Sequence, residues 1–344
     1  MSRSLITAQL SGHQGGQTAD AMPLVAEPVA AAAASGRHGL LDHPTMMAAA
    51  KGCVFIKAVA RSLGLPARTI GTAQLLAHRV YIFQGSPPGS STDVATACLL
   101  VAAKMEETIK RVRDILAHSY VLSTRATGAD PHSTPATTTD KMRPSVLAAE
   151  QFVMNAIGFD FRTSHPHLLY VKLAKLAKLA PGPHQTITAT GWTILSDAFF
   201  TTLPIQYPPA VMAAGSLCLA WSLDCDAPAA TAPFILESLA ASPADSYSSN
   251  SRRNGAADWR TRERPPSLDL AASEWWTAIG VATEDMRGFV RQIVDFYLLF
   301  FSSAIAPPAY MELHESGLPS KAIAQRIGQW RMRLDDVLAA PLPK

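Results

Sequence analysis

Apolar side chains recur every three or four residues over much of the chain, which is the spacing of helices that bury one face. Glycine, proline and clusters of small polar residues separate these stretches. The pattern therefore predicts an all-α protein. The predicted helices cover about 46–63, 66–83, 92–107, 112–120 and 144–157, then 168–179, 187–203, 209–223 and 284–296, with a further amphipathic candidate at 319–337.

The predicted helix that begins near Thr92 is the most informative of these. Ser91, Thr92 and Asp93 are N-cap candidates ahead of an apolar run that is rich in alanine. So many small side chains let neighbouring helices approach on several sides, and we therefore expect this helix to be central in a bundle. Lys104 then interrupts the apolar pattern. From the pattern alone it is either a lysine whose head reaches solvent or a paired, functional one.

The helix predicted at 209–223 matches the one at 92–107 at an offset of about 118 residues. The coinciding residues are small or apolar, which is weak evidence of a repeat by itself because many buried helices look alike. Ser222 stands at the position of Lys104, so the charge is not repeated.

Several segments lack helical spacing and are rich in small polar residues, proline or glycine. They divide the chain into two predicted helical domains. The expected division is a flexible arm at 1–45, a first domain at 46–162 with an insertion at 121–142, a second domain at 163–302 with an insertion at 226–270, and a tail at 303–344.

Bulk composition narrows the class of protein. Of the 344 residues, 48% are apolar and 17% are charged, which is enough to build a sizeable core. The net charge of +3 does not by itself indicate nucleic-acid binding. The longest apolar run, at 210–223, is too short to cross a bilayer, and the first residues lack a signal-peptide core. We therefore expect a soluble intracellular protein without a membrane partner.

The sequence contains no recognisable metal site or catalytic motif. The four cysteines form no C-x-x-C pair, and no cysteine or carboxylate shares the spacing of His165 and His167. Phosphate-binding, dinucleotide, zinc-protease and nucleophile-elbow motifs are missing. Lys172, Lys175 and Lys178 indicate a solvated helix face rather than a membrane-surface helix. We expect no cofactor and no metal, and a binding or regulatory protein rather than an enzyme.

Two segments, ACLLVAAKMEET at 97–108 and VLAAEQFVMNAIGFDF at 146–161, carry a resemblance to a known family. They resemble the central and fifth helices of the cyclin box, the module with which cyclins activate cyclin-dependent kinases. WTILSDAFFTTLPIQYPP, at 192–209, and Glu274-Trp275-Trp276 resemble transcription-type members such as cyclins K and T. The fungal beta subunit of the kinase acting on the carboxy-terminal domain of RNA polymerase II is an equally good match. The resemblance covers roughly 46–301 and implies a tandem of two five-helix bundles.

The resemblance also implies a kinase-binding surface. In that family a lysine and a glutamate, here Lys104 and Glu150, pair with each other and with the kinase backbone. Neighbouring methionine and phenylalanine positions present apolar contacts. Considered without the resemblance, these apolar residues fit an ordinary core and Glu150 fits an exposed helix charge. The implied kinase-binding residues are Lys104, Met105, Glu106, Glu150, Met154, Phe159 and Phe161.

The function implied by the resemblance is that of a nuclear regulatory subunit. It would bind and allosterically activate a cyclin-dependent kinase catalytic subunit, one that phosphorylates the carboxy-terminal domain of RNA polymerase II. The sequence leaves open whether a third regulatory subunit joins the complex. One rival is a transcription factor of the general factor B type, which uses the same tandem repeat on promoter DNA. It is disfavoured because the paired cysteines of a zinc ribbon are missing and the chain is only weakly basic. Another rival is a scaffold that binds a kinase without activating it.

Overall fold

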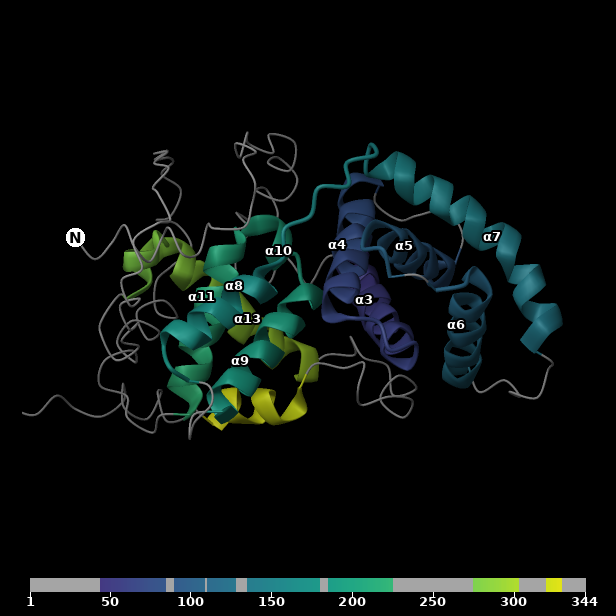
Figure 1. Ribbon diagram of the computed structural model, residues 1–344. Helices are drawn as coiled ribbons and strands as arrows, with labels where there is room; N and C mark the ends of the chain where they lie inside the picture. Colours follow the sequence, from purple (N-terminus) through teal and green to yellow (C-terminus); the bar gives the residue numbers. More distant parts are fainter. Residues whose placement is uncertain are drawn as a thin grey trace, which may run out of the picture.

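A computed structural model describes residues 44–84, 90–108, 110–127, 135–179, 185–224, 275–302 and 320–329. All regular structure within these ranges is helical, which confirms the predicted all-α fold. The helices form two groups that lie side by side (Figure 1). We call α3 to α7 the first repeat and α8 to α13 the second repeat. The predicted insertion at 226–270 and nearly all of the predicted arm at 1–45 lie outside the described residues.

The first repeat is built around α5. This helix contacts the other four helices of the repeat, and all ten residues from Val94 to Ala103 are buried. Alanine side chains at four of these positions allow the close approach on several sides that the sequence predicted. The predicted central position is therefore confirmed. The helices are α3 (Pro44–Ser62), α4 (Ala67–Gln84), α5 (Ser91–Met105), α6 (Val112–Thr127) and α7 (Pro135–Ala156).

The N-cap of α5 is Ser90, one residue before the predicted candidates Ser91, Thr92 and Asp93. Its hydroxyl accepts a hydrogen bond from the Thr92 N–H at 3.3 Å, and its backbone is extended. A side-chain acceptor at this position satisfies one of the free N–H groups of the first helical turn.

The predicted insertion at 121–142 is wrong in its secondary structure. α6 continues to Thr127 and α7 begins at Pro135, so only 128–134 of this stretch lie outside the described residues. α7 also runs through Pro144, where the sequence predicted the helix to begin. Packing explains the difference, because α7 contacts α6 and Thr139 is only 2% exposed. Such tertiary contacts outweigh the low helix propensity of a Thr-rich segment.

The second repeat is built in the same way around α11. This helix contacts α8, α9 and α13, and its residues from Val211 to Ala220 are all buried. Four long helices fall within the described part of this repeat, and residues 225–274 lie outside it. The elements are α8 (Pro166–Leu176), α9 (Gln185–Asp197), η1 (Ala198–Phe200), α10 (Leu203–Gln206), α11 (Pro209–Asp224), η2 (Trp275–Ile279) and α13 (Thr283–Ser302).

The helix predicted at 187–203 is broken in the structure. α9 ends at Asp197, a 3₁₀ turn follows, and α10 then begins at Leu203. Pro204 gives a physical reason, because it has no N–H to donate to the Phe200 carbonyl as a continuous helix would require. The break places Asp197 at the end of α9, where its side chain is fully buried.

Buried polar contacts join the two repeats. Lys57 of α3 donates to Asp197 of the second repeat at 2.8 Å, and its ammonium lies 4.5 Å from the centroid of the Phe200 ring. His78 of α4 lies with its Nε2 atom 3.0 Å from the Phe199 carbonyl oxygen, so that a protonated Nε2 donates to it. One continuous apolar core runs through both repeats around these contacts.

A short helix at 321–329 packs against the second repeat. Ile323 and Ile327 are 5% and 0% exposed, and the Ser320 N–H donates to Asp197 at 3.0 Å. Arg326 donates to the Leu223 carbonyl oxygen at 2.7 Å. The candidate helix at 319–337 is thus confirmed over its described part, and the rest lies outside the described residues.

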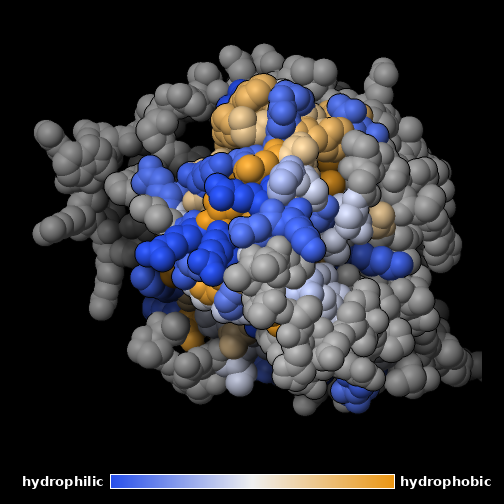
Figure 2. Space-filling model, turned by 90° about the vertical axis from the view of Figure 1, so that its right-hand side faces the viewer, coloured by the Kyte–Doolittle hydropathy of each residue, from blue (hydrophilic) through white to orange (hydrophobic). Residues whose placement is uncertain are grey.

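Among the described residues on the α6 and α7 side of the molecule, hydrophilic side chains gather at the centre of the view, and an apolar area lies above them (Figure 2). Within the described ranges, none of the helices combines the length and apolar character that crossing a bilayer would require.

Candidate functional site

The predicted charged pair forms at the edge of a groove on the first repeat. Lys104, in the last turn of α5, lies 2.5 Å from a carboxylate oxygen of Glu150 on α7. The Lys104 side chain is 59% exposed, whereas that of Glu150 is 13% exposed. The pair is therefore accessible on the lysine side and anchored against the protein on the glutamate side. The groove that it borders has a volume of about 610 Å³.

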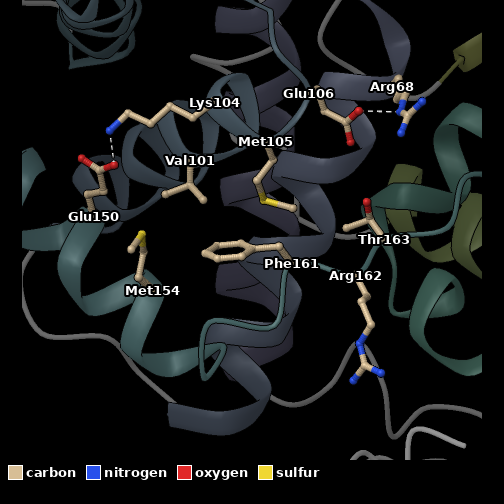
Figure 3. A pocket seen from close by; sticks show the side chains of 10 residues that line it. All are labelled: Arg68, Val101, Lys104, Met105, Glu106, Glu150, Met154, Phe161, Arg162 and Thr163. Carbon is tan, nitrogen blue, oxygen red and sulfur yellow. Dashed lines mark hydrogen bonds and ion pairs between the residues drawn. The ribbon is translucent and has the colours of Figure 1, made fainter. Parts of the chain in front are cut away.

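The floor of the groove is apolar. Val101 and Met105 come from α5, Met154 comes from α7, and Phe161 comes from the segment that follows α7. Figure 3 shows these four side chains converging between the charged pair on one side and Arg68 and Arg162 on the other. Met105 and Met154 are half-buried and pack against the core, while Phe161 remains 43% exposed. An apolar floor with charged rims is suited to an amphipathic partner segment.

The segment after α7 turns sharply to bring Phe161 to the groove. Gly158 and Phe159 both have left-handed backbone conformations, with φ of 59° and 55°. The Phe159 N–H donates to the Met154 carbonyl, and the Gly158 N–H donates to the Asn155 carbonyl. These two bonds are those of a Schellman motif, which ends a helix and satisfies its last carbonyl groups.

Phe159, another predicted contact, does not line the groove. Its ring packs edge-to-face against Phe161 with centroids 6.4 Å apart, and the residue is 56% exposed. It therefore presents an exposed apolar surface beside the groove.

Glu106, another predicted contact, lines the groove, and its carboxylate is turned toward Arg68 (Figure 3). Its side chain is 6% exposed and forms an ion pair with Arg68 at 2.5 Å. It also accepts a hydrogen bond from Thr72 at 2.7 Å and, when His165 Nε2 carries a proton, one from His165 at 3.3 Å. Burial lowers the pKa of His165 below its ordinary value, although the nearby Glu106 charge opposes this shift. Glu106 thus ties α4 and the end of α5 to the segment that enters α8.

Sequence reasoning missed four residues that line the groove: Arg68, Val101, Arg162 and Thr163. Val101 precedes Lys104 by three residues, so helical spacing already places the two side chains on one face. Arg162 directly follows Phe161 in the chain. Arg68 carries no such signal, since only the fold brings the start of α4 to the end of α5.

Arg162 forms a local ion pair beside the groove. Its Nε and Nη2 atoms donate to the two oxygens of Asp160 at 2.9 and 3.0 Å. These hydrogen bonds lower the pKa of Asp160 to about 2. Both side chains are solvent-accessible, at 74% and 30% exposed, so we assign the pair little stabilising energy.

Two other predicted features lie away from the groove. Lys172 and Lys175 lie on α8, half-buried and exposed respectively, whereas Lys178 is exposed in a left-handed turn beyond the end of α8 at Leu176, short of the predicted helix end at 179. His165 and His167 have ring centroids 6.4 Å apart, and His167 stacks on Phe199 at 5.5 Å. In the part of the chain that the structure describes, no three histidine, cysteine or acidic side chains cluster as metal ligands.

Comparison with known proteins gives a partial family match. The family model for the transcription factor TFIIB repeat matches residues 45–125. Curated relatives include the CTD kinase subunit beta of Schizosaccharomyces pombe, 32% identical over 55% of this chain and 55% of that protein. Cyclin-T1-4 of Arabidopsis thaliana is 29% identical over 49% of this chain and 31% of its own length. Cyclin-K of Homo sapiens is 29% identical over 50% of this chain and 29% of its own length.

These relatives confirm the resemblance to transcription-type cyclins. The chain spans about half the length of the S. pombe protein and less than a third of the two cyclins.

Proposed function

We propose that this chain, a relative of the transcription-type cyclins, is the regulatory subunit of a cyclin-dependent protein kinase and binds a helix of the kinase in the groove of the first repeat. The observation that carries the proposal is the Lys104–Glu150 pair at the rim of an apolar floor. In this proposal the chain is not itself an enzyme, requires no cofactor and acts in the nucleus.

The groove has features that suit an amphipathic helix. Apolar side chains of the partner would contact Met105, Met154 and Phe161, and a polar backbone group of the partner would bond the Lys104 ammonium. Phe159 adds apolar surface next to the groove. Glu106 contributes by holding the end of α5 in place rather than by direct contact, since its side chain is only 6% exposed.

Activation would follow from differential binding. A protein kinase is active only when a lysine–glutamate ion pair, whose glutamate lies on a mobile helix, and a metal-binding aspartate are all in place. A rigid surface that binds the active arrangement more tightly than the inactive one shifts the population toward activity. The buried core of the first repeat, with α5 enclosed by its neighbours, supplies the rigidity that this mechanism needs.

The proposed substrate is the carboxy-terminal domain of RNA polymerase II. This is supported by the name of the S. pombe relative, a CTD kinase subunit. We propose that the groove-bearing domain extends over 46–162 and the second domain over 163–302, with a tail at 303–344. The proposal leaves open whether a third subunit joins this complex.

Reconstitution with a CTD-phosphorylating cyclin-dependent kinase catalytic subunit tests the proposal. The measured quantity is the rate of phosphorylation of a peptide carrying the CTD heptad repeat. We expect the chain to raise this rate, and Lys104→Ala or Glu150→Ala to remove most of the increase. Lys110→Ala, which alters an exposed lysine outside the groove, is the matched control and should behave like the wild type. Binding without any rise in rate would support a non-activating scaffold instead.

A second candidate function is DNA binding, and the match of residues 45–125 to the TFIIB repeat favours it. A gel-shift measurement with duplex DNA separates it from kinase regulation. Tight, salt-sensitive DNA binding in the absence of any kinase would support this candidate, because phosphate contacts release counterions. We expect no such binding from a chain with a net charge of +3.

A further inference from the structure

A buried arginine forms hydrogen bonds with the backbone on both sides of Phe161. Arg79 of α4 is 6% exposed. Its Nη1 atom donates to the Asp160 carbonyl oxygen at 3.1 Å, and its Nη2 atom donates to the Arg162 carbonyl oxygen at 3.0 Å. The planar guanidinium presents its donors in a fixed fork, so the two bonds fix the two carbonyl groups relative to each other.

This pair of bonds restrains the segment from a separate helix, whereas the Phe159 ring contact and the Asp160–Arg162 bonds beside Phe161 are local to it. Phe161 is 43% exposed, and the chain reaches it through two consecutive left-handed residues. Left-handed backbone at a residue other than glycine is strained and persists only where the surroundings hold it. The Arg79 fork is a hydrogen-bonded restraint from another helix on this segment. It fixes the backbone on both sides of the residue whose ring enters the groove.

The second repeat contains an equivalent restraint of opposite charge. At the offset of 118 residues that relates α5 to α11, Arg79 corresponds to Asp197, since 197 − 79 = 118. Asp197 accepts a hydrogen bond from the Ser320 N–H, which directly precedes the helix at 321–329. In each repeat a buried charge on the second helix thus bonds backbone groups of a segment that lies later in the chain. A cation holds carbonyl groups in one repeat, and an anion holds an N–H group in the other.

We propose that Arg79 is a positioning residue for partner binding, which acts by orienting Phe161 rather than by touching the partner. The inference rests on the proposed function of the groove. It assigns a role to a residue that the partner cannot reach, since Arg79 is almost entirely covered.

A double-mutant cycle tests this inference. The dissociation constant for the kinase catalytic subunit is measured for Arg79→Met, Phe161→Ala and the double variant. If Arg79 acts through Phe161, each single change weakens binding about tenfold. The double variant then binds within about twofold of Phe161→Ala. Arg79→Lys, which keeps the charge but loses the fork, should give an intermediate loss.

Hydrogen exchange in the free protein gives an independent readout, and folding is verified for each variant by circular dichroism. We expect the amides of residues 159–162 to exchange faster in Arg79→Lys than in the wild type, while the amides of α5 do not. If Arg79→Met does not fold, Arg79→Lys replaces it in the cycle.

Two outcomes would overturn the inference. One is a double variant whose loss equals the product of the two single losses, which makes Arg79 independent of Phe161. The other is wild-type binding by Arg79→Met or by Phe161→Ala while Lys104→Ala still loses binding, in which case the proposed function stands without this role for Arg79. If none of these variants, Lys104→Ala included, loses binding, both the inference and the proposed function are wrong.

Discussion

The Lys57 ammonium lies 2.8 Å from a carboxylate oxygen of Asp197, and this pair connects α3 to α9 through two residues that are 140 positions apart in the chain. The two side chains are 6% and 0% exposed. Asp197 also accepts hydrogen bonds from the Tyr297 hydroxyl at 2.7 Å and from the Ser320 N–H. One buried carboxylate therefore holds the first repeat, α13 and the segment leading into the helix at 321–329.

Replacing Lys57 by methionine should be strongly destabilising. The change leaves the Asp197 charge buried without its cation, and removing one partner of a buried ion pair costs about 3–5 kcal/mol. Chemical denaturation followed by circular dichroism measures the free energy of unfolding. Lys51→Met on the same helix is the matched control, because Lys51 is exposed, and it should change stability by less than about 0.5 kcal/mol. Equal effects of the two variants would contradict the role of the pair.

Glu106→Gln should lower stability by roughly 1–3 kcal/mol, since a charged acceptor of several hydrogen bonds becomes a neutral one. The ion pair with Arg68 and the contact with His165 are both weakened by this change. The exposed neighbour Glu107 provides the control, and Glu107→Gln should be close to neutral. Thermal unfolding of the two variants in parallel measures the difference. A neutral Glu106→Gln would mean that the carboxylate is not needed to fix the end of α5.

Two glycines in buried helices should respond oppositely to alanine. At Gly215 on α11 a Cβ atom would overlap the Phe289 ring of α13, so Gly215→Ala should cost roughly 1–3 kcal/mol by overpacking. At Gly52 on α3 a Cβ atom would meet no heavy atom within 4 Å. Gly52→Ala should therefore stabilise the protein by about 0.5–1 kcal/mol through helix propensity alone. Melting temperatures that shift in the same direction would contradict this account of how α11 meets α13.

Stability should fall as the pH is lowered from about 6.5 to 4. Burial lowers the pKa of His78 to about 4, and burial together with His165 lowers that of His167 to about 4. The unfolded chain, with a histidine pKa near 6.5, binds more protons in this window, so acid favours unfolding by up to roughly 3 kcal/mol for each histidine. Protonation of Asp160 lowers stability only at a more acidic pH, because the pKa of this residue in the folded protein is about 2.

Urea denaturation at several pH values between 7 and 4 measures this dependence. The double variant His78→Gln/His167→Gln should be less stable at pH 7 and show a flatter profile. A wild-type protein whose stability is constant between pH 6.5 and 4.5 would contradict the prediction.

Much of the fold could be predicted because local spacing determines it. The central position of α5 followed from its alanine-rich apolar run, and the structure encloses this helix in the other four of its repeat. Errors arose where tertiary contacts override local preference. The Thr-rich start of α7 is helical because it packs on α6, which composition does not reveal.

The candidate site was predictable in part, but from the family resemblance rather than from local spacing. Lys104 and Glu150 were paired from the resemblance, and the structure brings their charged groups together. The burial of the Glu106 carboxylate was not predictable, because a carboxylate at a helix end is usually solvated and its partners Arg68, Thr72 and His165 lie on other elements. Lys57 and Asp197 are both charged residues next to apolar helical runs, a pattern that indicates buried charges. Local sequence cannot show that two residues so far apart in the chain form a pair.

An exchange of the two charges at the groove tests the central claim most directly. Lys104→Glu/Glu150→Lys retains an ion pair within the first repeat but reverses the charge that faces the partner. The dissociation constant for the kinase catalytic subunit is measured beside the wild type, with thermal unfolding as the control for folding. We expect unfolding to be nearly unchanged and binding to weaken at least 30-fold, equivalent to about 2 kcal/mol. A folded double variant that binds the kinase within twofold of the wild type would contradict the claim that this pair grips the partner.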